Sequence, residues 1–307
     1  MAERETENQI KRIRLWVSYD GTNYHGWQIQ NNGVTIESEL NRALSDLYGQ
    51  DIKVIGASRT DAGVHALGNV AVYDTESPIP AEKVCHALNA RLPEDIRVTK
   101  SEEVPADWHP RKCASRKTYE YRIYLGEVLP PVKRLYSHHV YRPLDIEAMR
   151  KAAAYLVGEH DFKSFCQENT QALSTVRTVY SIDLILTSES ADPQNAAQTT
   201  NAQTTDAKAP AAQTTDAKAP DAQSRLPFSG DLILRITGNG FLYNMVRIIA
   251  GTLLEVGVGR YAPEEVARIL EKKDRAAAGP TAPAKGLTLV KYEFPENEPT
   301  AGEPAEE

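Results

Sequence analysis

Apolar residues in this chain recur with two different periods, and the two kinds of segment are intermixed along its length. Period-two alternation at residues 13–19 puts apolar side chains on one face of a strand. Helical spacing at residues 36–47, after a Thr35 that suits an N-cap, predicts an amphipathic helix. Strands and helices do not follow a strict strand–helix–strand succession. The pattern therefore predicts an α+β fold with two sheet-and-helix halves that face one another.

The same two periods place the remaining elements. Further strands are expected at DIKVIGAS, LGNVAVY, IRVTKSEEV, SRKTYEYRIYL, VYSIDLILT, DLILRIT and LTLVKYEF. Further helices are expected at residues 81–88, 146–156 and 241–256 and after Pro263.

The net charge of −7 belongs to two segments that contain a single large apolar residue, Phe294. Residues 190–224 carry −2 and contain the tandem repeat AQTTDAKAPA and AQTTDAKAPD, and residues 293–307 carry −6. Ordering a residue costs roughly 1–2 kcal/mol of backbone entropy, which such segments have no apolar surface to offset. We therefore expect a disordered insertion at about 188–224, in place of a hairpin turn, and an acidic disordered tail at 296–307. The rest of the chain has a charge of +1, which leaves room for a polyanionic partner.

The cysteines and the N-terminal segment indicate in which cellular compartment the protein is expected. Cys85, Cys113 and Cys166 are far apart and odd in number, so neither a disulfide framework nor a thiolate metal site is expected. Residues 1–14 are charged throughout, and no run of about 18 apolar residues occurs. We expect a cytoplasmic protein that does not span a membrane.

The segment GASRTDAGVHA carries the first chemical signal. Asp61, followed by Ala62 and Gly63, fits an ordinary turn, because Asp accepts backbone N–H bonds and Gly allows a positive φ. Arg59 lies two residues before Asp61, so both side chains can project to one side, and a nearby guanidinium keeps a carboxylate ionised. An ionised and positioned carboxylate can act as a nucleophile or a base.

Two further segments combine charge with aromatic or apolar residues. In RKTYEYRIY, alternation puts Lys117 and Tyr119 on one face, which suits base stacking and phosphate binding as well as it suits a sheet core. In FLYNMVRIIAGTLLEVG, Arg247 lies within a broad apolar stripe. Such a cation either reaches water or needs a partner, because burying an unpaired charge costs several kcal/mol.

Five segments, in this order, resemble the tRNA pseudouridine synthase A family. They are YDGTNYHGWQIQ, GASRTDAGVHALGNV, RKTYEYRIY, LVGEHDFKSF and FLYNMVRIIAGTLLEVG. The resemblance covers about residues 10–295 apart from the insertion, and it implies the pseudouridine synthase fold, with a continuous antiparallel sheet and a central RNA-binding cleft. It implies a homodimer that isomerises uridine at tRNA positions 38, 39 and 40, with tRNA rather than DNA as its partner and without a cofactor. The corresponding halves are residues 1–112 and 113–295.

The resemblance also implies roles for five residues. Asp61 is the catalytic nucleophile, Arg59 helps to extrude the target base, and Arg247 pairs with Asp61. Tyr119 lies against the extruded uracil, with its hydroxyl as a candidate for removing the C5 proton, and Leu289 packs beneath the base. His65 is expected to be structural.

Two alternatives to the enzyme stay open at this stage. One is a catalytically silent RNA-binding or RNA-chaperone protein on the same fold. The other is a metal-dependent hydrolase that uses His25, His65 and Asp61, although their spacing matches no known ligand motif.

Overall fold

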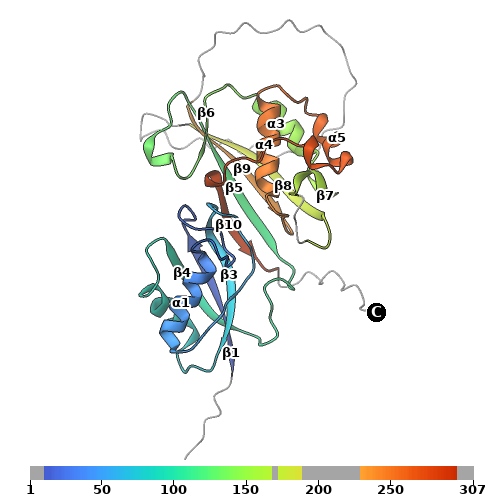
Figure 1. Ribbon diagram of the computed structural model, residues 1–307. Coiled ribbons are helices and arrows are strands. Elements are labelled where there is room, and N and C mark those ends of the chain that lie inside the picture. The colour runs from blue at the N-terminus through green and yellow to red at the C-terminus, as the bar shows by residue number, and fades with distance from the viewer. Residues whose placement is uncertain (1–9, 168–171, 189–228, 296–307) are drawn as a thin grey trace, which may run out of the picture.

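The computed structural model describes residues 10–167, 172–188 and 229–295 of the chain (Figure 1). The predicted insertion and acidic tail lie outside these residues, apart from Ser188, which ends a strand. The strands are β1 (Lys11–Tyr19), β2 (Ile55–Gly56), β3 (His65–Thr75), β4 (Ile96–Val104), β5 (Arg116–Leu125), β6 (His138–Val140), β7 (Gly158–Asp161), β8 (Val176–Ser188), β9 (Gly230–Gly238) and β10 (Leu287–Glu293). The helices are α1 (Ile36–Tyr48), α2 (Val84–Asn89), α3 (Ile146–Ala154), α4 (Met245–Gly257) and α5 (Glu265–Lys272).

One sheet runs through both halves of the chain, in the order β4-β1-β3-β10-β5-β9-β8-β7. Short strand β2 pairs with β3, and β6 pairs with β5. All pairs are antiparallel except β10 with β3 and β5 with β6. The last strand, β10, therefore joins the N-terminal half to the C-terminal half (Figure 1). The predicted α+β fold with a continuous, mostly antiparallel sheet is confirmed.

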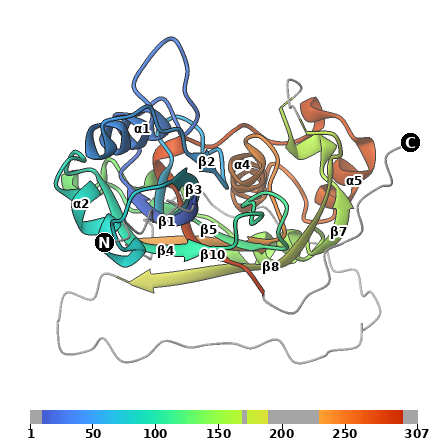
Figure 2. The ribbon, with the colours of Figure 1, turned by 90° about the horizontal axis from the view of Figure 1, so that it is seen from below.

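The helices lie on one side of this sheet, where the apolar residues of the strands point. Figure 2 shows α1, α4 and α5 above the sheet. On β1, alternate residues Ile13, Leu15, Val17 and Tyr19 are buried, as the period-two pattern predicts. On α4, both the apolar stripe and its flanks are buried, so this helix packs into the centre of the C-terminal half.

Two local predictions need correction, and two strands are additions to the prediction. Helix α4 begins at Met245 rather than Phe241, because Asn244 has a left-handed backbone with φ of 61°. The segment DIKVIGAS forms only the two residues of β2, since beyond it the side-chain oxygen of Asn69 accepts the Ser58 N–H in place of a sheet bond. Strands β6 and β7 carry no period-two signal and were not expected.

In the described part of the chain, no helix combines the length and the apolar character that crossing a bilayer requires.

Candidate active site

A cleft of about 1020 Å³ opens between the two halves of the sheet. Its walls come from the turn between β2 and β3, the segment entering β5, strand β5 itself, and the segment that leads into α4. We call residues 59–64 the Asp61 turn. The cleft thus lies where segments distant in the sequence meet.

The charge of the cleft is opposite in sign to that of the whole chain. Among the described residues that line it, Asp61 is the only carboxylate. The cations that line it are Arg59, Arg111, Lys112, Lys117 and Arg177. A concave surface with this excess of positive charge suits a polyanion.

Asp61 of the cleft pairs with Arg247 of α4, which is not itself among the lining residues. The Arg247 Nη1 atom donates to Asp61 Oδ2 at 3.3 Å, and each side chain is 17% exposed. Burial raises the pKa of Asp61 above its usual range, and the charge of Arg247 opposes that increase. The structure therefore brings together two of the residues that the sequence singles out, from opposite halves of the chain.

Arg247 is held by two further acceptors. Its Nε donates to the carbonyl oxygen of Ala282 at 2.8 Å, and its Nη1 donates to Asn244 Oδ1 at 2.7 Å. A guanidinium bound at its Nε and one Nη has little freedom to rotate. This explains how α4 accommodates a cation within an apolar helix face.

A loop before α1 supports the backbone of the Asp61 turn. We call residues 20–30 the brace loop. Trp27 N–H donates to the Thr60 carbonyl at 3.0 Å, and Gly63 N–H donates to the Tyr24 carbonyl at 3.3 Å. The brace loop comes so close because it has glycine at the contact: a Cβ on Gly26 would lie 2.6 Å from the Thr60 oxygen.

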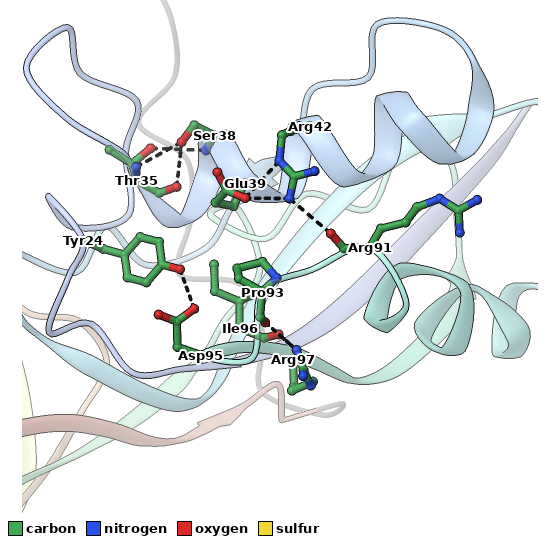
Figure 3. Close-up of polar contacts among 10 residues, drawn as sticks. All are labelled: Tyr24, Thr35, Ser38, Glu39, Arg42, Arg91, Pro93, Asp95, Ile96 and Arg97. Carbon is green, nitrogen blue, oxygen red and sulfur yellow. Dashed lines mark hydrogen bonds and ion pairs between the residues drawn. The ribbon is translucent and has the colours of Figure 1, made fainter.

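The brace loop is fixed in turn to the N-terminal half (Figure 3). The Tyr24 hydroxyl donates to Asp95 Oδ1 at 2.5 Å, just before β4. At the start of α1, the Ile36 and Glu37 N–H groups donate to the Gly26 and Trp27 carbonyls of the loop at 3.1 and 3.0 Å. The Thr35 side chain and Ser38 form the capping box that starts this helix, as the Thr35 N-cap predicts. The loop is therefore anchored to two elements that do not line the cleft.

The segment RKTYEYRIY is interpreted either as a surface for base stacking or as part of a sheet core, and its two tyrosines on β5 differ in this respect. Tyr121 is fully buried, and its hydroxyl donates to the Pro283 carbonyl at 2.9 Å, so it is a core residue. Tyr119 lines the cleft and makes an edge-to-face contact with Phe241 at 5.2 Å. Burial, followed by the charges of Tyr19 and Asp61, raises the pKa of Tyr119.

Lys117 lies two residues before Tyr119 on the same face of β5. Its ammonium nitrogen is 5.0 Å from the centre of the Tyr292 ring, within the range of a cation–π contact. Burial and the nearby charges of Arg177 and Arg111 lower the pKa of Lys117 to about 8. The cations of the cleft therefore repel one another at neutral pH.

The remaining sequence-derived candidates lie in different surroundings. Arg59 is exposed at the cleft, whereas Leu289 is fully buried on β10, opposite Tyr119 in the sheet, and is not among the lining residues. His65 is buried: its Nδ1 accepts the Gly21 N–H at 3.1 Å, and its Nε2 lies 3.3 Å from the Lys285 carbonyl oxygen. In the described residues, His25, His65 and Asp61 do not form a group that could hold a metal ion.

Sequence reasoning missed several residues of the cleft. Arg111 and Lys112 lie in HPRK, a basic segment between two strands, whose charge was the available signal. Arg177 lies on β8, and only the fold brings it to β5. Arg116, the first residue of RKTYEYRIY, lies 4.9 Å from the Tyr180 ring and is not among the lining residues.

Comparisons of the sequence with a family model and with individual known proteins agree with one another. A family model described as tRNA pseudouridine synthase matches residues 15–111 and 152–295. The tRNA pseudouridine synthase A of Ruminiclostridium cellulolyticum is 41% identical over 285 residues, which cover 93% of this chain and 100% of that protein. The enzymes of the same name from Thermoanaerobacter sp. strain X514 and Brevibacillus brevis are each 41% identical, over 92% and 91% of this chain and 99% and 98% of their own lengths.

The support of the Asp61 turn by the brace loop can be tested with two glycine substitutions. Gly26 and Gly49 both have positive φ, 85° and 67°, so alanine at either position should cost roughly 1–2 kcal/mol of backbone strain. Only at Gly26 would the new Cβ also collide with the Thr60 carbonyl; at Gly49 no described atom lies within 4 Å. We expect Gly26→Ala to lose more free energy of unfolding in urea than Gly49→Ala. Equal losses would contradict the brace.

Proposed function

Because this chain belongs to the tRNA pseudouridine synthase family, we propose that it isomerises uridines at positions 38, 39 and 40 in the anticodon arm of tRNA. The chain is an isomerase that converts uridine in tRNA to pseudouridine. The observation that supports the assignment to this cleft is the ion pair of Asp61 with Arg247, in which Asp61 lines the cleft together with five cations and is the only carboxylate among the described lining residues. Family membership favours the enzyme over a catalytically silent RNA-binding or RNA-chaperone protein.

The reaction is an internal rearrangement of one nucleoside. The N1–C1′ bond breaks, the uracil turns, and a C5–C1′ bond forms while C5 loses a proton and N1 gains one. No electrons are gained or lost overall, so the reaction needs no oxidant, and we propose that it needs no metal or other cofactor. It does need a group that stabilises or bonds to an intermediate and then leaves. In our proposal, Asp61 is this group, by attack at C1′, by addition at C6, or by assisting a glycal route.

The target base must leave its stack to reach Asp61, which costs a few kcal/mol. In our proposal, Arg59, exposed at the mouth of the cleft, helps to draw the base out, and Tyr119 lies against it. Since the pKa of Tyr119 is raised, its neutral phenol must pass on its own proton if it removes the C5 proton. Leu289 can support the base only through Tyr119, which it faces across the sheet.

In our proposal, the phosphates of the RNA backbone supply the negative charge that the cations of the cleft lack. Burial, followed by the charges of Arg177 and Arg111, lowers the pKa of Lys117, and bound phosphates would offset that repulsion. The homodimer, the cytoplasmic location, the exclusion of DNA and the domain boundary between residues 112 and 113 stay predictions.

Removal of the Asp61 carboxylate tests the proposed reaction. Asp61→Asn should lower the rate of tritium release from tRNA carrying 5-tritiated uridine by about 10⁴-fold or more, because loss of a nucleophile removes the main catalytic group. Binding of tRNA, measured by filter retention, should be largely retained. Asp51→Asn, at a carboxylate that is 77% exposed, is the matched control and should keep full activity.

Mapping pseudouridine in the product RNA tests the position separately. Transcripts that keep uridine at only one of positions 38, 39 and 40 should each be modified within the anticodon arm. Product confined to another arm of the tRNA would contradict the assignment of these positions while leaving the reaction itself in place.

The pH dependence of the reaction tests the pairing of Asp61 with Arg247. Arg247 lowers the pKa of Asp61, so Arg247→Gln should raise it further and shift the acid limb of the kcat/KM profile to higher pH. Activity then falls earlier as pH decreases, because the ionised carboxylate is lost earlier. Arg260→Gln removes an arginine that is 59% exposed in a surface ion pair and should leave the acid limb in place. A profile that Arg247→Gln does not shift is inconsistent with the pairing.

A further inference from the structure

Asn244, at the entry to α4, has an unusual backbone. Its φ is 61°, and Lys273 is the only other non-glycine residue with a positive φ in the described parts of the chain. This conformation is uncommon for residues other than glycine and costs of order 1 kcal/mol or more. The strain falls on a residue that lines the cleft.

The side chain of Asn244 also forgoes its ordinary role. An asparagine at the N-cap of a helix normally accepts a backbone N–H of the first turn, which is worth about 0.5–2 kcal/mol. Asn244 is the N-cap of α4, yet its side chain makes no capping hydrogen bond. Its Oδ1 instead accepts a hydrogen bond from Arg247 Nη1 at 2.7 Å.

The contact with Asn244 competes with the ion pair in the cleft. The same Nη1 that lies 2.7 Å from Asn244 Oδ1 lies 3.3 Å from Asp61 Oδ2. Charge-assisted bonds between a guanidinium and a carboxylate are usually about 2.7–2.9 Å long and often bidentate. Here the neutral amide has the short contact and the carboxylate has a single long one. The bond from Nε to the Ala282 carbonyl holds the other side of the guanidinium.

We propose that Asn244 is a positioning residue that restrains Arg247, so that the guanidinium meets Asp61 at one long contact and leaves the carboxylate open to substrate. A closed bidentate pair would occupy both oxygens of Asp61 and stabilise its charge, which weakens a nucleophile. Asn244 keeps the positive charge near Asp61 without that closure. The benefit for catalysis rests on the proposed function, whereas the restraint itself does not.

Asn244→Gly removes the acceptor while allowing the same backbone conformation. Released from Asn244, Arg247 closes on Asp61, and the pKa of Asp61 falls below its value in the parent chain. Tyr119 on β5 also interacts electrostatically with Asp61, and Arg59 on the Asp61 turn and His25 on the brace loop line the same cleft; the substitution leaves all three in place. Lys273→Gly is the matched control, because it relieves the other positive φ far from Asp61 in the sequence.

The first experiment is an NMR titration of the full chain without RNA. The carboxyl carbons of aspartate are labelled with ¹³C, and the Asp61 signal is assigned by its absence in Asp61→Asn. The expected result is a lower Asp61 pKa in Asn244→Gly and an unchanged one in Lys273→Gly. An unchanged or higher pKa in Asn244→Gly overturns the proposal.

A second variant covers the case in which Asn244→Gly does not fold. Asn244→Asp keeps an acceptor at the same place and binds Arg247 more firmly through its charge, so it should raise the Asp61 pKa. A fall in that variant equally overturns the proposal.

Kinetics supply the second readout. In Asn244→Gly, kcat for tritium release should fall by about 10- to 100-fold, with KM little changed and the acid limb of the profile shifted to lower pH. A change confined to KM, or an acid limb that does not move, overturns the proposal. If the parent chain releases no tritium, the proposed function fails, and the titration still decides on Asn244.

Discussion

The geometry of the cleft depends on close contact between two stretches of backbone, the brace loop and the Asp61 turn. The contact exists because Gly21 and Gly26 present no side chain where the turn passes, at Val64 and Thr60. Sheet bonds hold the chain on either side of the turn but do not fix Asp61 itself. The brace loop holds the Asp61 turn in a fixed position relative to the sheet. It thereby sets the distances from the Asp61 carboxylate to α4 and to β5.

Two opposing electrostatic effects meet at Asp61. Burial disfavours the charged carboxylate, and Arg247 favours it. Since both partners are mostly shielded from water, a small change in their separation has a larger energetic effect than it would at the surface. This explains why the residues that hold Arg247 matter as much as Arg247 itself. The surrounding cations give the cleft a positive charge that acts over longer distances, which suits a polyanion.

Local patterns predicted most of the elements, because alternation and helical spacing report directly on which side chains face a core. They placed Lys117 and Tyr119 on one face of β5 and left two alternatives for Arg247, contact with water or a partner, of which the structure has the partner. They failed where a single residue overrides the pattern, as Asn244 does at the start of α4 and Asn69 beside β2. Arg177 reaches the cleft only through strand pairing across the sheet, which no local pattern contains. Leu289, expected beneath the base, is fully buried on β10 opposite Tyr119.

The position of β10 has a consequence for how the protein is made. This strand is the last in the chain, yet it lies in the middle of the sheet, between β3 and β5. A ribosome that has finished the N-terminal half leaves β3 with an unpaired edge until the final strand emerges, and such edges are prone to pair with other chains. A nascent or truncated chain without β10 would have both walls of the cleft but no strand that pairs β3 with β5 in one sheet. Full-length synthesis is thus itself a condition for assembling the catalytic centre.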